Sequence, residues 1–516
     1  MKCICKNRGI LLLCYSLVAA LVISAVFVSA SAFASPAQES QEYTVIAKTP
    51  VPLSEIAERF FGKPDYWPAI MAATNRKHVE DPSFTRISDP KSIEPGWKLL
   101  IPDREWAEGF MKVWTPAKPE LLFGVGPKGQ LVVASWWTAG GEAEGLKGLF
   151  DIYRSKYPEV EIVNATVAGG AGYVFRAVVK PRLIAGDPPD TFQLHAGLEV
   201  EGYSPETYLK PLDDLYAIEG WKNVFPPDLL KLLEYKDHYW GVPVNIHRSN
   251  VLWYDKSIFA RAGLIPPRTW DEFFDVCETL KAQGIVPIVM GTKGGWEAGH
   301  VFEDILAGVL GAEKYKGLWT GATSWTDPLV TQALKVYKRM LTYVNTDHSA
   351  LSWDGAGEYM VANKGAMMIM GDWANGWFMA KGYTDYGWAP VPGTKGIFVA
   401  LSDTFCLPKM ARNRDNAIAW LRICGSKEGQ EAFNTKKGSI PSRMDCDPSL
   451  FNEYLQSAMR DWKTDAIVPS CIHGAAAIES WVTDYKDVIN LFTATGDVSA
   501  AQAALQEACI TAGVCK

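Results

Sequence analysis

The sequence predicts an α/β protein of two lobes joined by a hinge, with a small β-α-α-β unit in front of them. From Gly129 to Lys516, short apolar runs alternate with helix-like segments, the pattern of parallel sheets covered by helices. This stretch of nearly 390 residues is longer than one hydrophobic core usually organises, so we expect two lobes.

Individual elements of the two-lobed region can be placed from their apolar patterns and turn residues. Expected strands are Leu131–Ser135, Glu161–Val167, Thr191–His195 and Val286–Met290, and expected helices are 142–156, 173–185 and 269–283. We place the first crossing between the lobes at Tyr239–Asn245.

Residues 42–103 form the small unit. A strand at Tyr43–Val45, helices at 52–60 and 66–75, and a last strand reaching Pro102 give a β-α-α-β order, and Gly62 ends the first helix. With its closing motif IEPGWKLLIP, this unit resembles the LysM module, which implies binding to the N-acetylglucosamine backbone of peptidoglycan. Residues 48–52 depart from the family's Gly-Asp-Thr-Leu turn, and that change alters one rim of the expected groove.

Two further segments organise the chain. Residues 104–128 are rich in proline and glycine, which predicts a linker without a core of its own. Residues 1–34 read as a secretory signal peptide, because Lys2, Lys6 and Arg8 precede a long apolar run and a small-x-small site before Ser35. We therefore expect a periplasmic or other extracytoplasmic protein, although the apolar run is long enough for an uncleaved anchor.

Composition narrows the classes of function. The formal net charge is −7 and no basic stripe occurs, so we expect no nucleic-acid partner. Seven cysteines follow the signal peptide, an odd number that leaves at least one thiol unpaired within the chain. Cys509 with Cys515 and Cys446 with Cys471 are candidate pairs. No motif for a metal, cofactor, phosphate or nucleophile is present, so we expect neither a cofactor nor an enzyme.

The stretch LVVASWWTAGGE (131–142) points to a ligand. An apolar strand runs into Trp136 and Trp137, a Gly-Gly turn and Glu142, which places these side chains at the carboxyl edge of a sheet, where open α/β folds bind ligands. Indole faces suit the C–H surface of a sugar ring, and a carboxylate accepts from its hydroxyls.

Several blocks resemble the extracellular solute-binding proteins of ABC sugar importers. They include AGDPPDTFQLHAG (185–197), the segment 239–273, GAMMIMGDWANG (365–376) and KKGSIPSR (436–443). The set is closest to glucose- and mannose-type binders, which implies a hexose ligand, delivery to ABC permease subunits and a two-lobed periplasmic-binding-protein fold of type II. The resemblance implies as ligand contacts Trp136, Trp137, Glu142, Gln193, His195, Asn245, Trp353, Trp373, Asp403, Lys437 and His473.

These contacts divide by chemistry. Trp137, Trp353 and Trp373 would pack against the ring, while the polar residues would bond its hydroxyls. Asp372 can equally cap a turn, and Trp136 and Trp296 are the weakest candidates, of which we expect at least one to be structural.

Two alternative functions remain open. A glycoside hydrolase targeted to the cell wall would need two carboxylates across a glycosidic bond, and Glu142 and Asp403 are the two that we would nominate. A sugar sensor for a chemoreceptor would share the binding fold, and its sequence would look the same.

Overall fold

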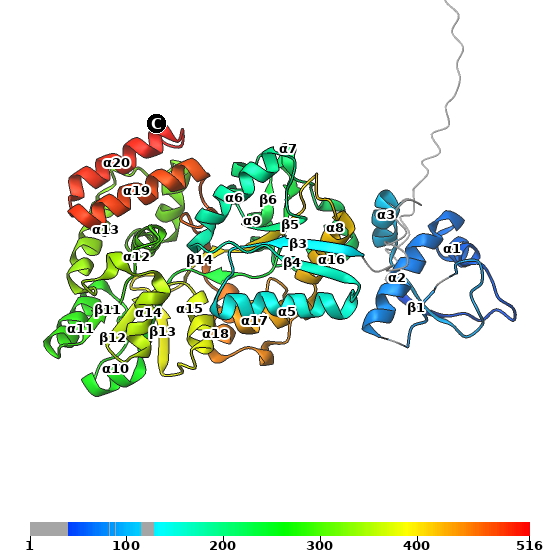
Figure 1. The fold of residues 1–516 in the computed structure, drawn as a ribbon, viewed down its shortest axis with the longest axis horizontal. Coiled ribbons are helices and arrows are strands. Elements are labelled where there is room, and N and C mark those ends of the chain that lie inside the picture. The colour runs from blue at the N-terminus through cyan, green and yellow to red at the C-terminus, as the bar shows by residue number, and fades with distance from the viewer. Residues whose placement is uncertain (1–39, 82, 88, 115–127) are drawn as a thin grey trace, which may run out of the picture.

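The computed structural model describes residues 40–81, 83–87, 89–114 and 128–516. Within these residues the chain forms the small N-terminal unit followed by two α/β lobes (Figure 1). The predicted signal peptide and most of the predicted linker lie outside the described residues. Among the residues that are described, no helix is both long enough and apolar enough to cross a membrane.

The N-terminal unit has the predicted β-α-α-β order. Its elements are β1 (Gln41–Thr44), α1 (Leu53–Phe61), the short η1 (Pro64–Tyr66), α2 (Trp67–Glu80) and β2 (Lys98–Ile101). β1 and β2 pair antiparallel, and both helices bury apolar side chains against them. Gly62 ends α1 in the left-handed region with φ 67°, as its position predicts.

The prediction of a coreless linker is wrong for its first part. Arg104–Val113 form a helix, α3, which is capped by Asp103 through a hydrogen bond from the Trp106 amide. Ala107 and Phe110 of this helix are buried in the core of the N-terminal unit. The prolines and glycines that suggested a linker begin only at Pro116, after the end of α3. They therefore gave no information about residues 104–113, whose apolar residues are spaced as in a helix.

α3 also joins the N-terminal unit to the first lobe. The Trp106 indole donates to the carbonyl of Ile218, whose side chain is buried in the N-terminal core. Arg76 binds Glu219 at 2.7 Å, and Arg422 of the lobe binds the other Glu219 oxygen at 3.0 Å. This unit therefore rests on α8 (Asp213–Glu219) through both apolar and charged contacts. Figure 1 shows it at this end of the first lobe.

The first lobe is a five-stranded sheet in the order β4-β3-β5-β15-β8. The strands are β3 (Gly129–Ala134), β4 (Val160–Asn164), β5 (Thr191–His195), β8 (Gly241–Pro243) and β15 (Asp403–Cys406). The lobe's helices are α5 (Gly140–Lys156), α6 (Tyr173–Ile184), α7 (Pro205–Tyr208), α8, α9 (Pro227–Leu233), α16 (Arg414–Gly425) and α17 (Lys427–Lys437), with a small β6–β7 hairpin (Glu234–Tyr235 and His238–Tyr239).

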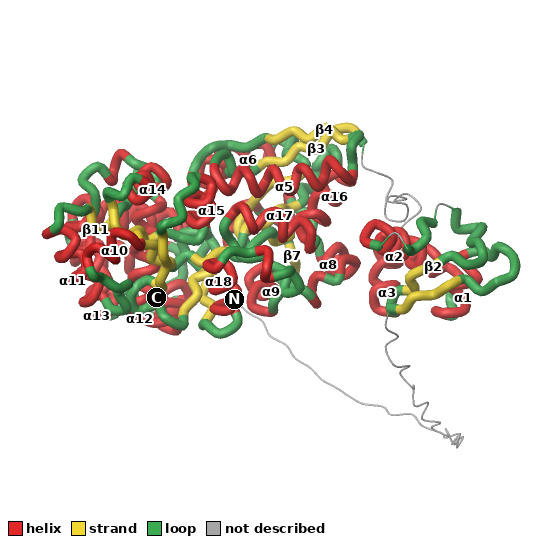
Figure 2. The backbone as a smooth tube through the Cα atoms, turned by 90° about the horizontal axis from the view of Figure 1, so that it is seen from below, coloured by secondary structure: helices red, strands yellow, loops and turns green. Residues whose placement is uncertain are grey.

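The second lobe has the sheet order β11-β12-β10-β13. Its strands are β10 (Val251–Asp255), β11 (Val286–Ile288), β12 (Gly365–Ile369) and β13 (Tyr386–Pro390). Its helices are α10 (Lys256–Ala262), α11 (Trp270–Ala282), α12 (Trp296–Thr320), α13 (Pro328–Met340), α14 (Trp353–Val361), α15 (Trp373–Ala380), α18 (Glu453–Trp462), α19 (Glu479–Thr495) and α20 (Val498–Thr511). Helices cover both lobes (Figure 2).

The sheets are mixed, which corrects the expectation of purely parallel sheets. β3 pairs parallel with β4 and β5, but β15 runs antiparallel to β5 and β8. In the second lobe only β11 and β12 are parallel, because β10 is antiparallel to both of its neighbours. A strand that returns from the other lobe joins the sheet in the reverse direction. The alternation of strands and helices along the sequence does not reveal this direction.

A third sheet, β16-β14-β9, lies between the lobes. It consists of β9 (His247–Arg248), β14 (Ile397–Leu401) and β16 (Ala466–Pro469). The chain passes from β8 of the first lobe to β9 through residues 244–246, at the end of the predicted crossing, and returns from β14 to β15 through Ser402. These crossings bring β5, β9 and β15 together at the base of the cleft.

One of the two predicted cysteine pairs forms a disulfide and the other does not. Cys509 and Cys515 form the predicted C-terminal disulfide. The other candidate pair is wrong, since Cys446 and Cys471 are both free and buried. They lie on separate segments, one in the loop after α17 and the other in the loop after β16.

Candidate functional site

A cavity of about 340 Å³ lies between the two lobes. Both lobes supply its walls: Trp136, Glu142 and Asp403 come from the first, and Trp353 and Trp373 from the second. Nine of the eleven predicted residues line it, namely Trp136, Trp137, Glu142, His195, Trp353, Trp373, Asp403, Lys437 and His473. The crossings of the chain thus gather residues that are up to about 340 positions apart.

Asp403 lies at the centre of the cavity floor, the group of buried polar side chains where the two lobes meet. It opens β15 opposite His195 of β5, and its Oδ1 accepts a hydrogen bond from Gln193 at 2.8 Å. Its Oδ2 accepts from Asn245 at 2.8 Å and lies 3.1 Å from Nε2 of His247. His195 Nε2 lies 3.7 Å from Oδ1, so four side chains surround one carboxylate.

Two of the predicted contacts, Gln193 and Asn245, do not line the cavity. Both are fully buried behind the cavity and hold Asp403 in place, instead of lining the wall themselves. Asn245 binds Asp403 twice, because its Oδ1 also accepts from the Asp403 amide at 2.8 Å. Gln193 accepts from the Trp136 amide at 3.2 Å, so it fixes the strand end that carries this indole.

A histidine that the sequence analysis did not select, His247, links the two lobes at the floor. Its Nδ1 binds Asp372 of the second lobe, and its Nε2 faces Asp403 of the first. Burial opposes protonation of His247, but the charge of Asp372 and the hydrogen bonds to Asp372 and Asp403 together outweigh burial and raise the pKa of His247 above its usual value. Burial likewise opposes ionisation of Asp403, yet the hydrogen bond and charge of His247 lower the pKa of that carboxyl. Both shifts favour an imidazolium held between two carboxylates.

Asp372 is thus a positioning residue. It stands at the N-cap of α15 but makes no side-chain cap there. Its second oxygen accepts from the Arg248 amide at 2.9 Å. Asp372 therefore joins the start of α15, which carries Trp373, to the interlobe strand β9.

Lys437 and Glu142 form a second polar group at the rim. Lys437 ends α17, and its ammonium binds Glu142 Oε1 at 2.8 Å. The Lys437 side chain is 2% exposed, whereas Glu142 is 28% exposed and reaches the opening. An ammonium has three N–H groups and one of them is used here in the described structure, so two remain for a ligand.

A hydrolase would need two carboxylates, for which Glu142 and Asp403 are the candidates. Both are engaged by cationic side chains.

Indole and imidazole rings form the apolar walls. The Trp136 ring lies 4.9 Å from that of His195, and the Trp373 ring lies 5.2 Å from that of His473. Burial, together with the neighbouring histidines, lowers the pKa of His473 well below its usual value, so this ring is neutral. Its Nδ1 lies 2.8 Å from the Ser470 hydroxyl, which leaves the other ring nitrogen for a ligand. Trp137 packs mainly against Phe433 at 4.8 Å, and its indole nitrogen is buried without a hydrogen-bond partner in the described structure.

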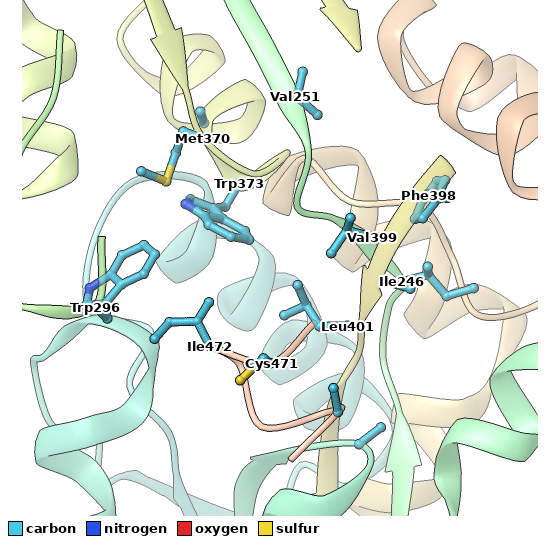
Figure 3. Packing of buried hydrophobic residues seen from close by; sticks show 14 of the residues in the cluster. Ile246, Val251, Trp296, Met370, Trp373, Phe398, Val399, Leu401, Cys471 and Ile472 are labelled. Carbon is cyan, nitrogen blue, oxygen red and sulfur yellow. The ribbon is translucent and has the colours of Figure 1, made fainter. Parts of the chain in front are cut away.

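Trp296 and Trp136, the weakest candidates, both line the cavity. Trp296 is the first residue of α12, directly after Gly295 with φ 78°. This turn aims the indole at Trp373, 6.0 Å away between centroids, and Figure 3 shows the two rings next to each other above Ile472. The glycines before Trp296 thus mark the start of α12.

The sequence held signals for two of the missed residues. His247 follows Asn245 by two positions in an extended segment, so the two side chains share a face. Trp377 follows Trp373 by one helical turn on α15 and also lines the cavity. No sequence signal marks Glu297, whose buried carboxyl lies on the wall and whose pKa burial raises to about 7.

The described residues contain no cluster of three or more histidine, cysteine or acidic side chains suited to a metal ion. Flat rings, a neutral histidine, an ammonium and carboxylates instead face one small cavity. Such a site binds a ring with an apolar face and a polar rim.

Comparison with known proteins agrees with this geometry. A family model described as bacterial extracellular solute-binding protein matches residues 133–431. An uncharacterised ABC transporter extracellular-binding protein of Pyrococcus horikoshii is 37% identical over 72% of this chain and 85% of its own length. A probable sugar-binding periplasmic protein of Brucella suis is 31% identical over 69% of this chain and 87% of its own.

A solved structure supports the fold. The solute receptor AcbH, described as preferring β-D-galactopyranose, superposes with a TM-score of 0.67 over 74% of this chain and 99% of its own, at 18% identity. The two-lobed α/β fold predicted from the sequence is thereby confirmed.

Proposed function

The chain belongs to the bacterial extracellular solute-binding proteins, and from this premise we propose that it binds one hexose and delivers it to the membrane subunits of an ABC importer. The observation that carries the proposal is the interlobe cavity. Its volume of about 340 Å³ is near the lower end for ligand pockets, which run from about 300 to 1,000 Å³. A space of that size suits one sugar ring better than an oligosaccharide.

The polar groups of the cavity match a pyranose rim. Lys437 donates, Glu142 accepts, and His473, whose Nδ1 is engaged by Ser470, offers its other ring nitrogen. Trp136 and Trp373 would cover the C–H surfaces of the ring. A hydroxyl in the wrong orientation would leave a charged partner unbonded, at a cost of about 1.5–3 kcal/mol for each lost bond, so the site can discriminate between epimers.

Hinge bending would couple binding to delivery. The lobes meet across the floor through His247 and Asp372, and α15 of the second lobe packs against α5 and α17 of the first. A sugar that contacts both lobes favours the closed arrangement, which presents a distinct surface to the permease.

The direct test is calorimetry of the full chain with glucose, mannose, galactose, maltose and a longer maltodextrin. We expect heat with at least one hexose, and a higher unfolding temperature in its presence. A response to the maltodextrin alone, or to no sugar, would refute the hexose proposal.

We also propose that the N-terminal unit binds peptidoglycan as LysM modules do. Its β-α-α-β order and closing motif support this. A fragment spanning 35–114, which keeps all of α3, should sediment with purified sacculi, as a known LysM module does in a parallel tube. Retention in the supernatant at physiological salt would refute the tether and leave the sugar proposal intact.

A further inference from the structure

One wall of the cavity is a contact between the lobes that centres on Trp296. This indole is 3% exposed and belongs to the second lobe. Its ring lies 6.0 Å from that of Trp373, 5.7 Å from that of His473 and 5.8 Å from that of His300. Three rings therefore fix it from one side.

A glycine-rich loop of the first lobe meets the same indole. The loop spans residues 168–172, between β4 and α6, and four of its residues line the cavity. A Cβ on Gly170 would lie only 2.4 Å from the indole nitrogen of Trp296. A Cβ on Gly172 would lie 3.0 Å from the Trp136 ring. The loop thus fits between the two indoles only because these positions lack side chains.

The backbone of the loop is shaped for this contact. Gly169 has φ 147°, Gly172 has φ 73°, and Ala171, which is not a glycine, has φ 48°. Positive φ values at three of four consecutive residues curl the chain back over the cavity, and a left-handed alanine is strained. The surrounding structure must hold this conformation, and the Trp136 and Trp296 rings are the groups against which it lies.

We infer that Trp296, closed against the 168–172 loop, sets the length of the ligand by blocking one end of the cavity. The inference rests on the proposed function, and it deepens it: the site takes a single pyranose because a second ring would have to occupy the position of this indole. Polar wall residues then choose among hexoses, and Trp296 excludes disaccharides.

The test measures dissociation constants of the full chain for its preferred hexose and for disaccharides that contain it. We expect the wild type to bind the hexose and to discriminate against the disaccharides. Trp296→Ala should weaken hexose binding and open the wall, so that the ratio of disaccharide to hexose dissociation constants falls by about tenfold or more. Trp296→Phe, which keeps an aromatic ring, should fall between the two.

Two further variants make the result specific. Gly170→Ala places a methyl group against the indole and should lower the ratio in the same direction, without removing any tryptophan. Trp270→Ala removes a half-buried tryptophan at the start of α11, outside the cavity, and should leave the ratio unchanged. Circular dichroism confirms that each variant is folded.

The outcomes separate the two proposals. Absence of sugar binding in the wild type refutes both. A wild type that binds disaccharides as tightly as hexose, or a folded Trp296→Ala variant and a folded Gly170→Ala variant that both keep the wild-type ratio, refutes only the length gate.

Discussion

At the scale of single residues, the site is organised by charges that alternate across the hinge. Two consecutive ion pairs connect the second lobe to the first, and their three side chains are nearly inaccessible to solvent: Asp372, His247 and Asp403. Buried ions of this kind are costly unless each is paired, so removing one leaves an uncompensated charge. These three paired side chains fix the base of the cavity, against which the aromatic residues pack.

Trp373 is the aromatic residue that this floor positions most directly. It follows Asp372 and packs against the rings of His247 at 5.5 Å and His473 at 5.2 Å. We predict that Trp373→Ala raises the hexose dissociation constant about tenfold or more, because a stacked ring contributes about 0.5–1.5 kcal/mol beyond its buried area. Calorimetry on the folded variant measures this. An unchanged constant would place the ligand away from α15.

A second prediction concerns Glu303, which lies beneath the site on α12. Burial raises its pKa from 4.5 to about 7, although Tyr315 and Ser470 donate hydrogen bonds to it. The folded state therefore retains a proton that the unfolded chain releases between about pH 4.5 and 7. The Glu303 contribution to stability is complete below that window and is lost as pH rises through it.

We predict that Glu303→Gln removes this part of the pH dependence. Between pH 5 and 7.5 the free energy of unfolding of the wild type should fall by about 2–3 kcal/mol more than that of the variant. Urea unfolding at both pH values measures the difference. Glu313→Gln, at an 85% exposed side chain, is the matched control and should follow the wild type. Parallel curves for wild type and Glu303→Gln would contradict the assignment.

At the scale of elements, three glycines let α15 approach the first lobe. A Cβ on Gly376 would lie 2.3 Å from the Lys437 carbonyl, one on Gly141 the same distance from the Lys436 carbonyl, and one on Gly438 2.3 Å from the Gly376 amide. Backbone meets backbone at each point, so no side chain can rotate to make room. The spacing of α5, α15 and α17 therefore depends on these positions.

We predict that Gly376→Ala weakens hexose binding at least tenfold, mainly through faster dissociation, because α15 can no longer close against α17. Stopped-flow kinetics and calorimetry check this. Gly148→Ala on α5 is the control, since its Cβ would come no closer than 3.4 Å to any neighbour. Equal dissociation rates for the two variants would show that the close contact is not required for binding.

At the scale of the whole molecule, the N-terminal unit is docked onto the first lobe, away from the cavity. The contact uses Trp106, Arg76 and the Ile218–Glu219 corner, while every cavity residue lies beyond position 135. The cavity and the N-terminal unit thus lie in separate parts of the chain, and the described contacts of the unit are with the first lobe.

We predict that a 129–516 fragment binds the hexose within about twofold of the full chain but unfolds at a lower temperature. Its affinity should be preserved because the complete cavity wall is present, and its stability should fall because Ile218, 4% exposed in the full chain, loses its cover. Calorimetry and thermal unfolding measure the two quantities. A large loss of affinity with an unchanged melting temperature would reverse this division of roles.

The sequence by itself determined the class of fold, the small β-α-α-β unit, the place of the hinge and nine of the residues around the cavity. Apolar periodicity and turn residues are local signals, so Thr191–His195 and the α11 helix could be placed within a residue of their ends. The Cys509–Cys515 disulfide joins residues only six positions apart, so it too could be predicted from a short stretch of sequence. Motif resemblance then gathered distant blocks into one site.

Only the tertiary structure decided which polar residues line the cavity and which lie behind it. Gln193 and Asn245 hold Asp403, His247 bridges the lobes, and Trp296 meets Gly170 across the cleft. Each of these roles depends on contacts between strands or lobes distant in sequence, including antiparallel returns that alternation along the chain does not encode. Packing sets the distances between such residues, and local sequence patterns carry no information about them.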